Sequence, residues 1–148
     1  MARPILEFHV LRICLYLLGT TAVGIALSGF FLGLRAIDAT EWLFDQLARA
    51  PHRASAPVSA TYDSEFRFYS VLWFSYGAAM LWTARRLADQ LSLVIPFALI
   101  FLVGGLGRLI SDLAVGPPHP AFIALTVPEL VLPPLVIVLV LRIRASRH

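Results

Sequence analysis

Four apolar runs of about 20 residues follow one another along the chain, separated by short polar segments. The runs cover about 12–34, 66–84, 91–110 and 122–141. A helix needs roughly 20 apolar residues to cross the hydrocarbon core of a bilayer. The pattern therefore predicts an all-α fold, an integral membrane four-helix bundle that forms a single domain over residues 1–148.

The longest polar stretch lies between the first two runs, and its first half has an amphipathic pattern over about 38–50. The apolar residues on one side are Trp42, Leu43, Leu47 and Ala50, and the charged residues elsewhere are Glu41, Asp45 and Arg49. Such a pattern is typical of a helix that lies in the membrane interface. We expect a short interfacial helix in the first outer loop.

Composition agrees with a membrane protein. Hydrophobic residues make up 59% of the chain and charged residues 14%, against about 45–50% apolar residues in a soluble domain. The lipid bilayer is the expected partner. The pI near 9.6 does not point to nucleic acid, because the twelve basic residues are scattered and several flank apolar runs.

The distribution of arginines predicts the orientation. With four spans, one side carries Arg3, Arg12, Arg85, Arg86, Arg142, Arg144 and Arg147. The other side carries Arg35, Arg49, Arg53, Arg67 and Arg108. The first set lies in short segments, where the excess of arginine on the cytoplasmic side is strongest. We expect both termini in the cytoplasm.

Small residues recur along one face of the first run. They are Ala22, Ala26, Gly29 and Gly33, at spacings of four, three and four. Small residues let two membrane helices approach closely. We expect another helix to pack there, more readily one of the same chain than one of a second copy, although both remain open.

Two ionisable residues lie within the apolar runs, where a charge costs about 2.5–3.5 kcal/mol on insertion scales. Arg108 lies near the outer end of the third run, and Glu129 lies about two turns inside the outer end of the fourth. Since these helices are expected to be antiparallel neighbours, the two side chains are expected to meet. Three polar residues at the start of the second span reach a similar level: Glu65, Arg67 and Tyr69.

Prolines in the fourth run favour an irregular backbone beside Glu129. Pro133 leaves the carbonyl of Glu129 without its helical donor. The glycines that would face this kink are Gly104, Gly105 and Gly107. A polar cavity for a ligand is one interpretation. The other, which the sequence favours, is a structural pair that keeps two helices in register.

Other chemistries are less well supported. Cys14 is the only cysteine, so neither an intrachain disulfide nor a thiolate cluster can form. The four histidines fall at different levels of the chain, which disfavours a haem with two histidine ligands. Motifs for phosphate binding, zinc proteases and serine hydrolases are missing. We therefore expect no catalytic residues, no metal and no cofactor.

Three segments resemble a family of small bacterial membrane proteins, domain of unknown function 4345. They are Asp63-Ser-Glu-Phe-Arg-Phe-Tyr69, Gly104-Gly-Leu-Gly-Arg-Leu-Ile-Ser111, and Gly116-Pro-Pro-His-Pro120 with Glu129-Leu-Val-Leu-Pro133. The resemblance runs from the first span to the fourth. It implies a multi-pass protein of the bacterial inner membrane and supplies no activity or substrate.

Three functions remain open from the sequence. The favoured one is a non-enzymatic accessory or packing subunit of a larger membrane complex, or of a homo-oligomer, because helix-packing features are clear. The second is a binder or carrier of a lipid or quinone-like molecule at Arg108 and Glu129. The third is a membrane enzyme that uses Glu129 as an acid or base.

Overall fold

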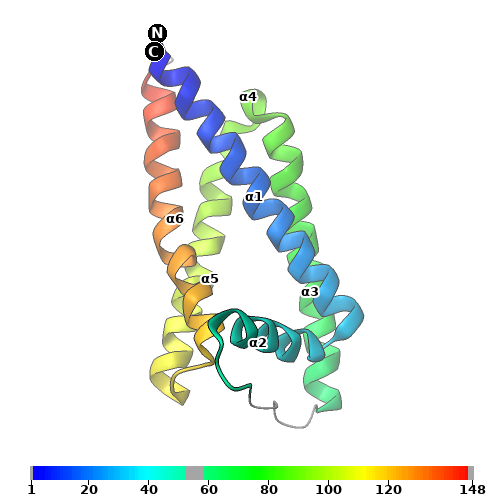
Figure 1. Cartoon of the computed structure of the whole chain (residues 1–148). Coiled ribbons are helices and arrows are strands. Elements are labelled where there is room, and N and C mark those ends of the chain that lie inside the picture. Colours follow the sequence, from blue (N-terminus) through cyan, green and yellow to red (C-terminus); the bar gives the residue numbers. More distant parts are fainter. Residues whose placement is uncertain (1, 53–58, 147–148) are drawn as a thin grey trace. The chain divides into compact units, whose positions relative to one another are not determined.

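The computed structural model describes residues 2–52 and 59–146, and these residues form helices joined by turns, with no strand (Figure 1). The all-α prediction is confirmed. The elements in order are α1 (Ala2–Leu32), α2 (Arg35–Ala48), α3 (Ala60–Arg85), α4 (Leu87–Gln90), the 3-10 turn η1 (Leu91–Leu93), α5 (Val94–Val115) and α6 (Pro120–Ala145).

Within these described ranges, three stretches are long and apolar enough to cross a membrane: Leu6–Leu32, Leu87–Val115 and Pro120–Ala145. Helix α3, which contains the predicted span 66–84, is not among them. Its length is sufficient, but serines, tyrosines and tryptophans lower its apolar character. The count of four spans therefore stays a prediction.

The helix expected at 38–50 begins and ends earlier, as α2. It stops because Arg49 adopts a left-handed backbone conformation, with φ of 55°. Its apolar side is turned outward: Leu47 is 78% exposed, whereas Asp45 is 5% exposed. Arg53 and Arg147, which enter the orientation argument, lie outside the described residues.

The chain divides into two compact units, which are described separately. The first unit combines Met1–Gly19 with Ala79–His148, and the second comprises Thr20–Ala78. In the first unit, the described large side chains that are completely buried include Leu11 and Leu15 of α1, Leu87 of α4, Val94 of α5 and Val140 of α6.

Helices α5 and α6 form an antiparallel hairpin in the first unit (Figure 1). Gly116, with φ of 113°, ends α5. His119 caps α6, because its Nδ1 accepts a hydrogen bond of 3.2 Å from the amide of Ala121. Pro120 then occupies the first turn of α6, where a missing N–H costs nothing.

The close approach of this hairpin depends on Gly105. A Cβ atom there would lie 2.9 Å from Cβ of Glu129 and 3.0 Å from Cδ2 of Leu130. Gly104 and Gly107 are different, since a Cβ at either would meet nothing within 4 Å. Of the three glycines, Gly105 alone faces α6.

The second unit contains the small-residue face of α1. Ala22, Ala26, Gly29 and Gly33 are all buried. A Cβ at Gly29 would overlap Oγ of Ser70 and lie 3.0 Å from Cε1 of Phe66. This face of α1 therefore packs against α3 of the same chain.

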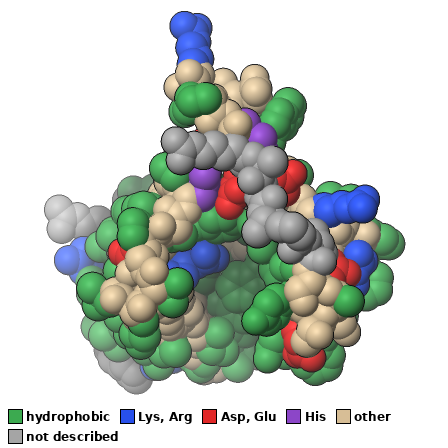
Figure 2. Space-filling model, turned by 90° about the horizontal axis from the view of Figure 1, so that it is seen from below, with side chains coloured by type: hydrophobic (Ala, Val, Ile, Leu, Met, Phe, Trp, Pro, Cys, Tyr) green, Lys and Arg blue, Asp and Glu red, His purple; other side chains and the backbone are tan. Residues whose placement is uncertain are grey.

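Large apolar side chains remain exposed along the helices, and Figure 2 shows hydrophobic side chains at the surface among charged and polar ones. Leu113 and Val115 of α5 and Phe31 of α1 are examples. Exposure on this scale is unusual for a protein surrounded by water. It is the surface expected of helices that contact lipid.

The two kinds of glycine in α5 give the first test. We expect Gly105→Ala to destabilise the protein by about 1–3 kcal/mol, because the added methyl group overpacks against Glu129. Gly104→Ala is the matched control and should leave stability equal or slightly higher. Unfolding in detergent micelles, followed by circular dichroism, measures both. Equal effects of the two substitutions would contradict the close contact.

Candidate functional site

An ion pair joins α5 to α6 in the first unit. Nε of Arg108 lies 2.8 Å from Oε2 of Glu129. Glu129 is 7% exposed, whereas 41% of the Arg108 side chain is accessible. The carboxylate is therefore enclosed by the hairpin, and the guanidinium reaches it from the surface.

Local geometry explains how these two residues meet. Gly105 lies one turn before Arg108, and its missing side chain lets α6 approach so that the short glutamate side chain spans the gap. The guanidinium also lies over the ring of Phe122, 5.9 Å from its centroid. Oε2 is at ion-pair distance, but the Nε–H does not point at it with hydrogen-bond geometry. Electrostatic attraction between the two charges, more than a well-aligned hydrogen bond, therefore holds the pair together.

Prolines do not interrupt α6, although three lie inside it. Pro128, Pro133 and Pro134 all fall within Pro120–Ala145. Pro133 is buried, and its ring nitrogen leaves the carbonyl of Glu129 without a helical donor. The backbone at this level of α6 therefore carries an acceptor beside the ion pair.

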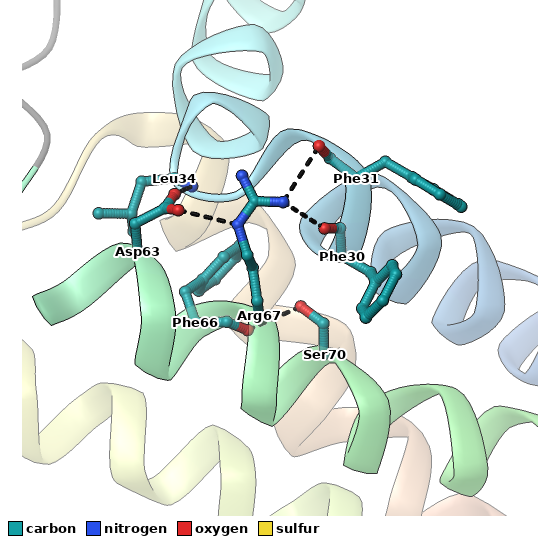
Figure 3. Close-up of polar contacts among 7 residues, drawn as sticks. All are labelled: Phe30, Phe31, Leu34, Asp63, Phe66, Arg67 and Ser70. Carbon is teal, nitrogen blue, oxygen red and sulfur yellow. Dashed lines mark hydrogen bonds and ion pairs between the residues drawn. The ribbon is translucent and has the colours of Figure 1, made fainter. Parts of the chain in front are cut away.

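A second polar arrangement lies in the second unit and is called here the Asp63–Arg67 clasp: Asp63 and Arg67 of α3 with the turn at Gly33 and Leu34 (Figure 3). Oδ1 of Asp63 accepts a 2.8 Å hydrogen bond from the amide of Leu34. Oδ2 accepts one of 2.8 Å from Nε of Arg67. The carboxylate thus holds the start of α2 and orients the arginine.

The arginine of the clasp completes the end of α1. Nη1 of Arg67 donates to the carbonyls of Phe30, at 2.5 Å, and Phe31, at 3.2 Å. In a continuing helix the Phe30 carbonyl would accept from the amide of Leu34. That amide donates to Asp63 instead. Arg67 therefore replaces the missing donor where α1 ends.

Gly33 makes the clasp possible. Its φ is 60°, a conformation that side chains disfavour. A Cβ there would overlap Oδ1 of Asp63 and lie 2.7 Å from Nη2 of Arg67. Both the turn and the space for two charged side chains need a residue without a side chain.

Electrostatics favours the ionised form of the clasp. The hydrogen bond from Arg67, followed by that from the amide of Leu34, lowers the pKa of Asp63 below its ordinary value of 3.8. The charge of Arg35 acts in the same direction. Asp63 is therefore a carboxylate throughout the physiological pH range.

The residues expected to share one polar site fall into the two units. Arg108 and Glu129 meet in the first unit, and Glu65, Arg67 and Tyr69 belong to the second. Glu65 and Tyr69 are exposed on α3. Their joint site with Arg108 stays a prediction.

The sequence reasoning missed the role of Asp63. Its signal was present, because Asp63 and Arg67 stand four residues apart, the spacing at which helical side chains pair. What the spacing did not reveal is that both residues also bind the backbone of a distant turn.

A third cluster surrounds His52 after α2. Its Nδ1 lies 3.0 Å from Oδ2 of Asp45, and its Nε2 lies 3.6 Å from Oδ1 of Asp38. In the described ranges, no group of three histidine, cysteine or acidic residues has the arrangement of a metal site. The cluster joins the polar side of α2 to the segment that follows it.

Comparison with known proteins adds one positive result. A family model described as Domain of unknown function (DUF4345) matches residues 10–140. The curated proteins gave no match. The solved structures gave none either.

The clasp predicts a specific acid sensitivity. The folded-state pKa of Asp63 is depressed, so its stabilising contribution is present above the ordinary pKa and is lost as the pH falls through the folded pKa. We expect Asp63→Asn to lower the unfolding temperature at pH 7, and the difference from wild type to shrink below pH 3.8. Melting curves at several pH values measure this. Glu65→Gln, an exposed change on the same helix, should follow wild type; a constant Asp63→Asn difference would contradict the assignment.

The Arg108–Glu129 pair predicts an asymmetry. Arg108→Leu leaves a buried carboxylate unpaired and should cost about 3–5 kcal/mol. Glu129→Leu should cost less, because the half-exposed arginine can reach solvent or headgroups. The double variant should recover most of the stability, since well-packed apolar residues can replace an ion pair. The unfolding free energies of the wild type and the three variants, measured in detergent micelles, form a double-mutant cycle. If the loss in the double variant equals the sum of the two single losses, the charges do not interact.

Proposed function

We propose that this chain, which belongs to the family Domain of unknown function (DUF4345), is a non-enzymatic membrane module that packs against other membrane helices as an accessory subunit. Membership of this family agrees with the resemblance seen in the sequence and assigns no activity. One observation carries the proposal: an exposed small-residue face on α5, a helix apolar enough to span a membrane.

That face consists of Gly104, Gly107 and Ser111, spaced by three and four residues and all exposed. A Cβ at either glycine would meet nothing within 4 Å. Membrane helices use small residues where another helix approaches closely. Leu106, an exposed bulky residue of α5, lies on a different side of the helix, as expected for lipid contact.

The intramembrane charges support the same function. Arg108 and Glu129 neutralise each other directly, so Glu129 is engaged by a cation instead of standing ready as an acid or base. A pair of this kind gives the hairpin one fixed register. A rigid hairpin is a suitable frame for presenting a packing face.

Four spans, both termini in the cytoplasm and a bacterial inner-membrane location complete the proposal. The basic residues in the last turn of α6, Arg142 and Arg144, support the orientation. The outward apolar side of α2, with Trp42 and Leu47 exposed, supports an interfacial position. In this arrangement α3 is the fourth span despite its serines and tyrosines.

A second candidate is a binder of a lipid or quinone-like molecule at Arg108 and Glu129. It is favoured by the accessible guanidinium and by an oxygen of Glu129 that lacks a well-directed donor. The double variant Arg108→Leu with Glu129→Leu separates the candidates. Normal association with loss of a co-purifying amphipathic molecule would favour the binder.

Photo-crosslinking in intact membranes tests the packing function. A photoreactive residue at Ile100, on the side of Gly104 and Gly107, should give a crosslinked protein; one at Leu106 should contact mainly lipid. Changing both glycines to isoleucine should abolish the Ile100 product, because the bulky side chains keep the partner away. Equal products from both positions, or no protein product from either, would reject the proposal.

A further inference from the structure

The second unit contains a groove that shares no residue with the two sites proposed in the first unit. The groove has a volume of about 230 Å³. It is formed by the last two turns of α1 and the middle of α3. Its lining residues are Ala26, Leu27, Phe30, Phe31, Ser70, Val71 and Phe74. The groove is smaller than the roughly 300–1,000 Å³ of sites for drug-sized molecules, so a narrow chain suits it.

The wall of the groove is apolar. Ser70 is its one polar residue, and the hydroxyl of Ser70 is buried and donates to the carbonyl of Phe66. The rings of Phe30 and Phe31 are exposed and meet edge to face at 5.3 Å. Because α1 is long and apolar enough to span a bilayer, an open apolar groove on it faces hydrocarbon, and an acyl chain is the occupant that a bilayer supplies.

A cation stands at one end of the groove. Nη1 of Arg67 donates to the carbonyls of Phe30 and Phe31, whose rings line the groove, and Nε donates to Asp63 (Figure 3). The contacts described for Arg67 do not involve Nη2, and 40% of the side chain is accessible. Gly33 leaves room for Nη2 itself, since a Cβ there would lie 2.7 Å from this atom. One edge of the guanidinium is therefore available to an oxyanion.

The local charge favours an anion. Arg67 and Asp63 balance each other, and the exposed Arg35, whose charge also acts on that carboxylate, adds a second arginine beside the clasp. Glu65 does not cancel this positive charge, since two residues after Asp63 it points to the other side of α3. An arginine pair at the end of an apolar groove matches a phosphate attached to an acyl chain.

We propose that this groove binds one acyl chain of an anionic phospholipid, with the phosphate at Arg67 and Arg35. Binding places the end of α1, the turn at Gly33 and the clasp at the level of the headgroups. The lipid site rests on observations in the second unit and does not depend on the packing function.

Native mass spectrometry of the full chain released from detergent tests the proposal. The probes are phosphatidylglycerol and phosphatidylcholine with identical acyl chains. We expect wild type to retain phosphatidylglycerol more strongly. Arg35→Gln should lower this retention about fivefold and leave phosphatidylcholine unchanged. Arg49→Gln, an exposed change at the end of α2, is its control and should change neither.

The groove itself is tested by filling it. Val71→Phe should lower retention of both lipids, because its ring occupies the space of the acyl chain. The neighbouring Leu72→Phe, exposed and outside the lining, should not. If Val71→Phe fails to fold, Leu27→Phe with Ile25→Phe as control makes the same comparison. Equal retention of the two lipids by wild type, or equal effects of lining and control variants, overturns the proposal. A change in oligomeric mass without a change in lipid adducts would assign the groove to a second copy and also overturns it.

Discussion

Polar groups on apolar helices need partners within the protein, because hydrocarbon supplies none. The buried carboxylate of Glu129 meets Arg108 across the α5–α6 hairpin. Some hydroxyl groups also find a partner within the protein: Thr126 donates to the carbonyl of Phe122, and Ser70 donates to the carbonyl of Phe66. At the end of α1 the amide of Leu34 is taken by Asp63. The irregular backbone where α1 ends is thus matched by two specific side chains, those of Asp63 and Arg67.

Glycine decides where these partners can meet. Gly105 brings Glu129 within reach of α5, and Gly33 leaves room for Asp63 and Arg67. The remaining glycines of α5 have no such internal use, which is why Gly104 and Gly107 attract a different explanation. The same residue type therefore serves internal packing at one position and presents an open face one residue away.

The two proposals describe different surfaces. The small-residue face lies on α5 in the first unit and suits the backbone of another helix, which needs close approach but no cavity. The groove between α1 and α3 lies in the second unit, is lined by apolar side chains and has Arg67 at one end. An accessory subunit with a bound lipid is consistent with both, although neither proposal requires the other.

The sequence by itself determined the all-helical, apolar character of the chain and its family, because runs of about 20 apolar residues and local motifs are readable without coordinates. Helix ends were predicted to within several residues, as at α2. The meeting of Arg108 with Glu129 was also predictable from two neighbouring antiparallel spans. The clasp was not, because Asp63 and Arg67 bind a turn about thirty residues away in the chain. Which glycine faces a neighbour, and which groove remains open, depends on the rotation of one helix against another. Tertiary packing alone decides that rotation.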